Sequence, residues 1–207
     1  MIIFDAFTGL RRNEILALHY TDIDWANKEI VINKAVSKTK ASNGVRKWEW
    51  RIGPPKSRKS NRRVAAPDAL IELLRHLQST RKDPSGLVFP DLEGQRIDPD
   101  YFDEFIFGPI AVRAGLPEVR FHDLRHFFAS MLIAQGESAK YVCDQMGHSS
   151  IQVTFDTYGH LFPNSRETAA KKLQQAMFIG RTTTFGSSLV AIGGKQGWEK
   201  PTEKIGM

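Results

Sequence analysis

Two arginines and a histidine have the residue types and spacing to bind a phosphodiester. His122 and Arg125 lie three residues apart in a predicted helix, so their side chains share one face. Arg11 follows Thr8-Gly9, where the sequence predicts a break between two helical segments. Because one guanidinium group can bind two phosphate oxygens, Arg11 and Arg125 could together hold the non-bridging oxygens of one phosphate. Taken alone, His122 and Arg125 also fit an exposed polar helix face.

Glu14 and His148 could support such an anion site. Glu14 lies three residues after Arg11, where its carboxylate could orient a guanidinium or an imidazole. An ordinary surface Arg–Glu pair, which contributes little to stability, fits the same spacing. His148 lies between a predicted helix stop at Gly147 and a predicted serine cap, near a helix start that favours anions. A structural loop histidine fits that position equally well.

Tyr158 could attack a phosphate bound in this way. It follows Thr157 near the end of a predicted helix, where a tyrosine is usually a packing residue. A phenol has a pKa of about 10, so it needs cationic neighbours or a base before it can act as a nucleophile. Arginines and histidines gathered around a phosphate would provide both.

One segment of the chain predicts β-structure between long helical stretches. β-branched or alternating residues predict strands at Glu29–Asn33, Trp48–Ile52 and Arg62–Ala66. We expect these runs to form one small three-stranded antiparallel sheet with basic connecting loops. Lys56–Asn61 is expected at the tip that joins the second and third strands.

Apolar periodicity and capping residues predict helices over most of the remaining chain. They are expected over 2–20 with the break at Thr8-Gly9, from Pro67, from Asp98-Pro99 with Phe102, Phe105 and Ile106 facing inward, over 121–135, from Ser138 to Met146, from Ser149 or Ser150 through Tyr158, and from Asn164 or Ser165 to about Phe178. The predicted class is α+β and mainly helical, with one domain over residues 1–178. The glycine-rich residues 179–207 are predicted to form a flexible or partner-ordered tail.

The positive charge of the chain is concentrated in one segment. The 207 residues contain 29 Lys+Arg and 23 Asp+Glu, yet 11 of the basic residues and one acid lie between Lys34 and Arg63. Such a basic patch indicates a polyanionic partner, most often nucleic acid, although a solvated lysine-rich loop fits as well. The candidate DNA-binding residues are Lys38, Lys40, Arg46, Lys47, Arg58, Lys59, Arg62 and Arg63.

Composition excludes several other classes of protein. The length suits one domain with a sizeable core. A single cysteine cannot form an intramolecular disulfide, so nothing in the chain requires an oxidising compartment. The chain contains no run of 18 apolar residues, so no membrane span is indicated. The first residues lack the basic region and cleavage site of a secretory signal.

Five motifs, taken in order, resemble the tyrosine recombinases of the phage integrase type. They are TGLRRNE at 8–14, the basic turn with Lys56, HDLRH at 122–126, GHSS at 147–150 and TYGHL at 157–161. Each motif alone is a weak signal, but the set in this order and spacing is highly specific. The resemblance extends over about three quarters of the chain, roughly from Phe7 to Pro163. It implies the catalytic fold of these enzymes and site-specific DNA recombination.

The resemblance also implies a role for each matching residue. Tyr158 would attack the scissile phosphate, leaving a 3′-phosphotyrosyl link and a free 5′-hydroxyl. Arg11 and Arg125 would bind the non-bridging oxygens and stabilise the developing charge. Lys56 would protonate the leaving 5′-oxygen.

Three further residues match supporting positions of the family. His122 would assist as a general base, His148 would hydrogen-bond the phosphate and Glu14 would support the site. Because a phosphotyrosine retains the free energy of the diester, and side chains neutralise the phosphate, the resemblance implies no ATP, metal or other cofactor. It implies double-stranded DNA as partner, a homo-tetramer assembled on that DNA and no membrane. It also implies a cytoplasmic location, which is nucleoid-associated if the protein is of bacterial or phage origin.

The chain departs from the family at its beginning. Family members generally carry an upstream helical domain that clamps the other side of the DNA, whereas this chain starts inside the predicted catalytic domain. We therefore expect a truncated first helix and no N-terminal core-binding domain. Independent recombination by this chain is in doubt for the same reason.

Two other functions remain open from the sequence. One is a DNA-binding remnant that keeps the fold without activity. The other is a metal-dependent phosphohydrolase whose ligands would come from His122, Asp123, His126, His148 and His160. The nearby Arg11 and Arg125 would disfavour a divalent cation, and His126 and His160 are otherwise interpreted as supporting or structural residues.

Overall fold

The computed structural model describes residues 1–41, 48–55, 60–81, 85–162 and 166–178. The chain divides into two compact units, residues 1–163 and 164–207, and each is described by itself. The domain boundary predicted at residue 178 stays a prediction. Within the described ranges, no helix is long and apolar enough to cross a bilayer.

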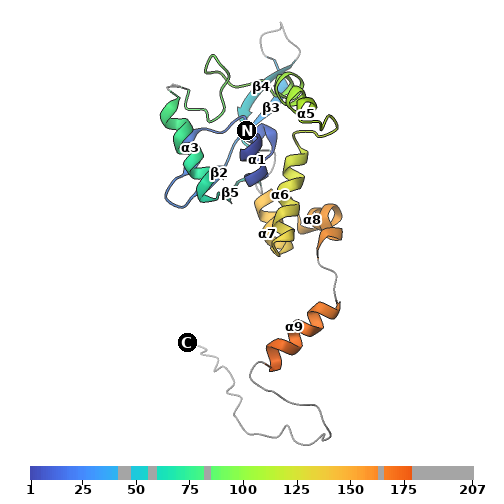
Figure 1. The fold of residues 1–207 in the computed structure, drawn as a ribbon. Helices are drawn as coiled ribbons and strands as arrows, with labels where there is room; N and C mark the ends of the chain where they lie inside the picture. Colours follow the sequence, from blue (N-terminus) through green and yellow to red (C-terminus); the bar gives the residue numbers. More distant parts are fainter. Residues whose placement is uncertain (42–47, 56–59, 82–84, 163–165, 179–207) are drawn as a thin grey trace, which may run out of the picture. The chain divides into compact units, whose positions relative to one another are not determined.

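The first part of unit 1 carries short helices, five strands and one longer helix (Figure 1). These elements are α1 (Ile2–Thr8), α2 (Arg12–Ile15), η1 (Tyr20–Asp22), β1 (Ile23–Asp24), β2 (Glu29–Ile32), β3 (Ala35–Lys40), β4 (Trp48–Gly53), β5 (Arg62–Ala65) and α3 (Asp68–Thr80). The predicted break at Thr8-Gly9 is confirmed. Gly9 ends α1 with φ 56°, a left-handed conformation that favours glycine.

The predicted three-stranded antiparallel sheet exists, but its strands are β1, β2 and β5. β2 pairs directly with β5, with Ile30 opposite Val64. The prediction that Trp48–Ile52 belongs to this sheet is wrong, because β4 forms a separate hairpin with β3, in which Val36 lies opposite Ile52. The lysines of β3 are typical of a solvated loop and so obscure this strand in the sequence, and Val36 is its one buried residue. The predicted tip residues 56–59 lie outside the described residues.

Helices make up the rest of unit 1: α4 (Pro99–Tyr101), η3 (Phe102–Phe107), α5 (Gly108–Arg113), α6 (Asp123–Ala134), α7 (Ala139–Met146), α8 (Ile151–Tyr158) and η4 (Gly159–Leu161). The predicted caps of α7 are confirmed, since Ser138 Oγ accepts a hydrogen bond from the Tyr141 N–H and Gly147 ends the helix at φ 62°. α6 packs against α1, and α7 packs against α6, α8 and β5. α7 therefore joins the helical part to the sheet.

One residue of a predicted inward face, Phe105, is wrong, while Ile106 is half-buried against the core as expected. Phe102 is buried as expected, but Phe105 is 58% exposed and Phe107 is buried in its place. The cause is that η3 is a π-helix, whose wider turn rotates later side chains away from the positions that an α-helical period predicts.

Two core clusters surround the predicted site. The larger one joins α1, the three-stranded sheet, α3 and η3 through Phe4, Ile30, Val64, Leu70 and Phe102. The second joins α6, α7 and α8 and includes Phe128, Val142, Met146 and Tyr158. In unit 2 the structure describes α9 (Arg166–Phe178), whose described side chains from 170 to 177 are exposed.

Candidate active site

The turn at Gly9 sets the direction of Arg11. A Cβ atom at Gly9 would clash with the Phe128 ring of α6, so the end of α1 and α6 approach at a distance that only glycine permits. Arg11 then begins α2, and its backbone N–H donates to Glu14 Oε2 over 2.8 Å. Arg11 Nη1 donates to the other carboxylate oxygen over 3.0 Å. Glu14 thus fixes both the backbone and the side chain of Arg11.

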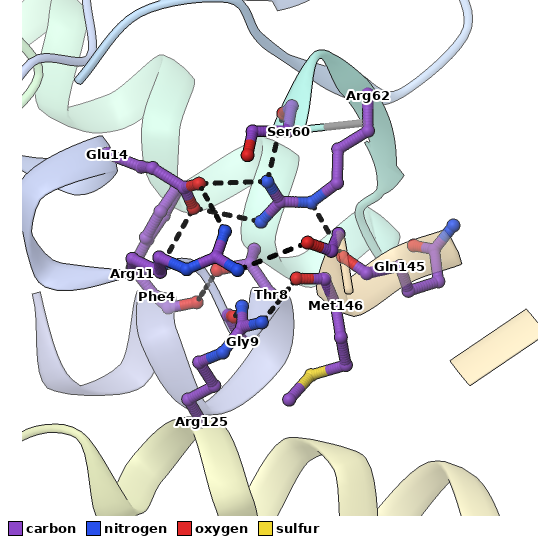
Figure 2. A network of polar contacts seen from close by, with 11 residues as sticks. Phe4, Thr8, Gly9, Arg11, Glu14, Ser60, Arg62, Arg125, Gln145 and Met146 are labelled. Atoms are coloured by element: carbon purple, nitrogen blue, oxygen red, sulfur yellow. Dashed lines mark hydrogen bonds and ion pairs between the residues drawn. The ribbon is translucent and has the colours of Figure 1, made fainter. Parts of the chain in front are cut away.

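Three guanidinium groups meet the carboxyl end of α7 at three consecutive carbonyl oxygens. Arg62 Nε donates to the Gln145 carbonyl over 2.8 Å, Arg125 Nη2 donates to the Met146 carbonyl, and Arg11 Nη2 donates to the Gly147 carbonyl over 3.1 Å. Arg125 Nη1 also donates to the Gly9 carbonyl. The last carbonyls of a helix lack partners within the helix and form its negative end, so cations are favoured there. Figure 2 shows Arg11, Arg62 and Arg125 directed toward one another at this point.

Glu14 is the carboxylate at the centre of this cluster. Its oxygens accept from Arg62 Nη1 over 3.0 Å and Arg62 Nη2 over 2.9 Å, in addition to the Arg11 contacts (Figure 2). Glu14 is 3% exposed, and burial opposes its ionisation, but the contacts with Arg62 and Arg11 hold the pKa of its carboxyl below the usual value. A buried carboxylate with two arginine partners therefore remains charged.

Arg125 is the most deeply buried arginine of the cluster, with 3% exposure. Burial and the neighbouring charges of Arg11 and Arg62 lower the pKa of its guanidinium to about 9. The three guanidinium groups repel one another and have Glu14 as counter-ion. An added anion would reduce this repulsion. An arginine has five N–H donors, so each guanidinium retains donors beyond its carbonyl contacts.

Tyr158 and His148 adjoin the arginine cluster. His148 stacks on the Tyr158 ring with centroids 6.3 Å apart, and its Nδ1 lies 2.9 Å from Thr154 Oγ1. Burial and the charges of Arg125, Arg11 and Arg62 lower the pKa of His148 to about 4, so its imidazole is neutral near pH 7. Burial raises the pKa of the Tyr158 hydroxyl, and the charge of Arg125 acts in the opposite direction. A phosphate bound here would lie near the same arginines and His148 that surround Tyr158.

The structure gathers most of the predicted site residues in one place. Arg11, Glu14, Arg125, His148 and Tyr158 converge through the contacts above. His122 lies beside them: its pKa is lowered by burial and then by the charge of Arg125. Lys56 lies outside the described residues, so its predicted position is untested.

The predicted DNA-binding residues fall into three groups. Lys38 and Lys40 are exposed on β3, and Arg63 is 54% exposed on β5, where it pairs with Asp24 and Glu29. Arg46, Lys47, Arg58 and Lys59 lie outside the described residues. Arg62 corrects the prediction: its side chain is 6% exposed and bound to Glu14, so it belongs to the interior of the site and not to an exposed DNA-binding face.

Two residues of the site, Arg62 and His126, are more important in the structure than the sequence indicates. In the sequence Arg62 is one of several basic residues, and no local signal distinguishes it from Arg63 beside it. His126 is interpreted from the sequence as supporting or structural, yet its Nδ1 lies 2.8 Å from the Tyr158 hydroxyl oxygen. Its place directly after Arg125 in a predicted helix is the available signal. Among the described residues, no three His, Cys, Asp or Glu side chains form a set that could hold a metal ion.

Comparisons with known proteins identify similar chains. The family model described as the phage integrase family matches residues 1–165. A tyrosine recombinase XerC-like protein of Caldanaerobacter subterraneus subsp. tengcongensis is 30% identical over 83% of this chain and 47% of its own length. The ICEBs1 integrase of Bacillus subtilis is 29% identical over 82% of this chain and 46% of its own length. The chain thus spans about half the length of these relatives.

The fold also resembles solved structures. The integrase of the Tn1549 transposon, solved in complex with a circular-intermediate DNA, superposes with a TM-score of 0.67 over 85% of this chain and 57% of that chain. The two sequences are 18% identical, so this likeness shows the fold. It supports the α+β class, mainly helical with a small antiparallel sheet, that the sequence predicts.

Proposed function

Since the chain belongs to the phage integrase family, we propose that it is the catalytic part of a site-specific recombinase, which cleaves and rejoins DNA strands through a 3′-phosphotyrosyl intermediate on Tyr158. The observation that carries the proposal is the convergence of Arg11, Arg125 and His148 beside the Tyr158 ring. These groups supply positive charge and hydrogen-bond donors next to a potential oxygen nucleophile.

Arg11 and Arg125 bind the non-bridging oxygens of the scissile phosphate. Their guanidinium groups are already oriented by the Gly147, Met146 and Gly9 carbonyls, so little reorganisation is needed when charge develops on the phosphoryl group. Neutral His148 donates a hydrogen bond to the same phosphate, and Glu14 holds Arg11 in place. His122 assists proton transfer near Arg125.

The chemical step is a transesterification. The Tyr158 oxygen forms a bond to phosphorus as the bond from phosphorus to the 5′-oxygen breaks, and Lys56 protonates the leaving oxygen. The phosphotyrosyl ester retains the free energy of the diester, so a 5′-hydroxyl can displace the tyrosine without ATP. Arginine charge neutralises the phosphate, and no metal is required by this scheme.

Double-stranded DNA lies against the basic segment in this proposal. Its contacts are Lys38 and Lys40 on β3, Arg63 on β5, and Arg46, Lys47, Arg58 and Lys59. Recombination of two duplexes needs four strand cleavages, so we propose a homo-tetramer on DNA. The proposed site of action is the cytoplasm, at the nucleoid if the protein is of bacterial or phage origin.

A second candidate is a DNA-binding remnant without strand cleavage. The basic side chains exposed on β3 and β5 would bind DNA whether or not Tyr158 cleaves it. The metal-dependent phosphohydrolase has no ligand set in the described part of the chain.

A covalent-trapping experiment tests the proposal. The full chain is incubated with a pool of nicked duplexes that have a randomised centre, in which cleavage releases a short 5′-hydroxyl strand and prevents rejoining. We expect a denaturant-resistant protein–DNA adduct that survives chelator, is absent with Tyr158→Phe and persists with Tyr101→Phe, whose side chain is exposed on α4. Salt-sensitive binding without an adduct would support the remnant instead.

A further inference from the structure

The Tyr158 hydroxyl has one polar partner within the described residues, and that partner is His126. Their Nδ1 and hydroxyl oxygen are 2.8 Å apart, and their ring centroids are 5.8 Å apart. This is the reach at which a general base can accept a proton from a nucleophile. The contact joins α6 to α8, two helices that both contribute to the second core cluster.

α6 holds His126 where it can serve Tyr158. Arg125, directly before it, is fixed between the Gly9 and Met146 carbonyls, and Phe128, two residues on, packs beneath Gly9. The backbone around His126 is therefore held on both sides. Its ring is half-buried, and the edge that carries Nδ1 faces the tyrosine oxygen.

The other histidines have different partners. His148 uses its Nδ1 for the Thr154 hydroxyl and lies nearly parallel to the Tyr158 ring, with centroids 6.3 Å apart. His122 contacts the ring of His126, edge to face with centroids 5.1 Å apart. His126 thus contacts the reacting oxygen of Tyr158 directly, whereas His122 contacts the His126 ring.

We propose that His126 is a further catalytic residue of this chain, acting as the general base that deprotonates Tyr158. The inference rests on the proposed function. In cleavage, the Tyr158 O–H bond breaks and its proton moves to Nδ1, while the freed oxygen electron pair forms the bond to phosphorus. The bond from phosphorus to the 5′-oxygen breaks, and that oxygen takes its own proton from the general acid. In rejoining, Nδ1 returns its proton to the departing tyrosine oxygen.

This role requires a histidine that is neutral before attack, with Nδ1 free of hydrogen and Nε2 protonated. The imidazolium formed in the step then lies beside the nascent phosphotyrosyl ester. It adds positive charge where the phosphate is already held by arginines. General-base catalysis of this kind contributes about 10²- to 10⁴-fold to a rate.

His126→Asn provides the first test. An asparagine can place a polar atom near the position of Nδ1, so it preserves a hydrogen bond to Tyr158 but cannot accept the proton. We expect adduct formation to slow by about 10²-fold or more, with DNA affinity and melting temperature unchanged. Ser130→Ala is the matched control on the same helix, because its hydroxyl donates only to the His126 carbonyl. A His126→Asn protein that forms the adduct at the unmodified rate overturns the proposal.

A bridging 5′-phosphorothiolate substrate separates the base from the acid. A thiol has a pKa of about 8.5, so a thiolate leaves without protonation and loss of a general acid is masked. We expect His126→Asn to remain slow on this substrate. Restoration of the rate by sulfur would assign His126 to the leaving group and overturn the proposal.

Chemical rescue adds a readout that a purely structural role would not move. Imidazole in solution should restore adduct formation by His126→Gly in proportion to its concentration, and should leave Tyr158→Phe inactive. If His126→Asn formed the adduct normally, and His122→Asn lost adduct formation that imidazole then restored, the base would be His122. Failure of the unmodified chain to form any adduct overturns the proposed function itself, which is a different result from a selective His126 defect.

Discussion

The Glu14 carboxylate and the Arg62 guanidinium face each other with two parallel contacts, Nη1 to Oε1 at 3.0 Å and Nη2 to Oε2 at 2.9 Å. They join α2 to β5 across 48 residues of sequence. Arg62 also packs against Gly147, because a Cβ atom added at Gly147 would lie 2.9 Å from Arg62 Nη1. One buried arginine therefore holds the residue that orients Arg11 and the loop that carries His148.

Arg62→Ala should destabilise the chain far more than Arg63→Ala. Removing one partner of a buried ion pair leaves a poorly compensated charge and costs about 3–5 kcal/mol. Arg11 remains beside Glu14, so the lower end of that range is expected. Arg63 is exposed, and its loss should change the free energy of unfolding little. Urea denaturation of the two variants checks this, and equal effects would show that Arg62 is not buried as described.

Asp5→Asn should stabilise the chain at about pH 8 and not at about pH 4. Burial raises the pKa of the Asp5 carboxyl to about 7, although the charge of Arg125 acts against this. A raised folded-state pKa contributes stability below the unfolded value of 3.8, and that stability is lost as the pH rises through about 7. An amide cannot ionise, so it avoids this loss, which is about 1.4 kcal/mol for each pH unit that separates the folded and unfolded pKa values.

Thermal melting at both pH values measures the effect of Asp5→Asn. Asp24→Asn is the control of opposite sign, because hydrogen bonds from Asn27 and Arg63 lower the pKa of Asp24 to about 2. That variant should melt lower than the unmodified chain at about pH 8. A destabilising Asp5→Asn at this pH would contradict the expected sign.

Gly9→Ala should destabilise the chain and slow adduct formation. The left-handed conformation costs a side chain about 1–2 kcal/mol, and the clash with Phe128 forces α1 and α6 apart. Arg125 loses its carbonyl contact at Gly9 by the same movement. Gly115→Ala is the control, since Gly115 also has positive φ but nothing lies within 4 Å of its added Cβ. Comparing the melting temperatures and adduct-trapping rates of Gly9→Ala and Gly115→Ala separates the backbone strain of positive φ from the clash with Phe128.

Lys38→Gln with Lys40→Gln should weaken DNA binding and its dependence on salt. Each phosphate contact contributes about 0.9 to the slope of log affinity against log salt, so the slope should fall by about 2. Lys38 must leave Asp100, which is 3.1 Å away, to reach a phosphate. Lys140→Gln on α7 should leave the slope unchanged. Fluorescence anisotropy at several salt concentrations measures the slopes, and a shared change in all variants would exclude a specific role for β3.

The sequence by itself determined the α+β class and most helix positions. It also predicted five residues that the structure brings together: Arg11, Glu14, Arg125, His148 and Tyr158. These predictions rest on local patterns: the apolar period of α3, the Ser138 and Gly147 caps of α7, and short motifs whose order resembles one family. Such patterns extend over a few neighbouring residues, so they can be recognised in the sequence without knowledge of the tertiary structure.

Only the tertiary structure decided how the elements pair and which side chains meet. Arg62 and Arg63 are the same residue type in adjacent strand positions, and strand alternation sends one inward and one outward; which one depends on the register of β5 with β2. Trp48–Ile52 pairs with the neighbouring β3 in a hairpin, whereas β2 pairs with the more distant β5, and the alternation within each strand does not show which partner it takes. His126 meets Tyr158 across 32 residues through the packing of α7 against both α6 and α8, a relationship that no local spacing contains.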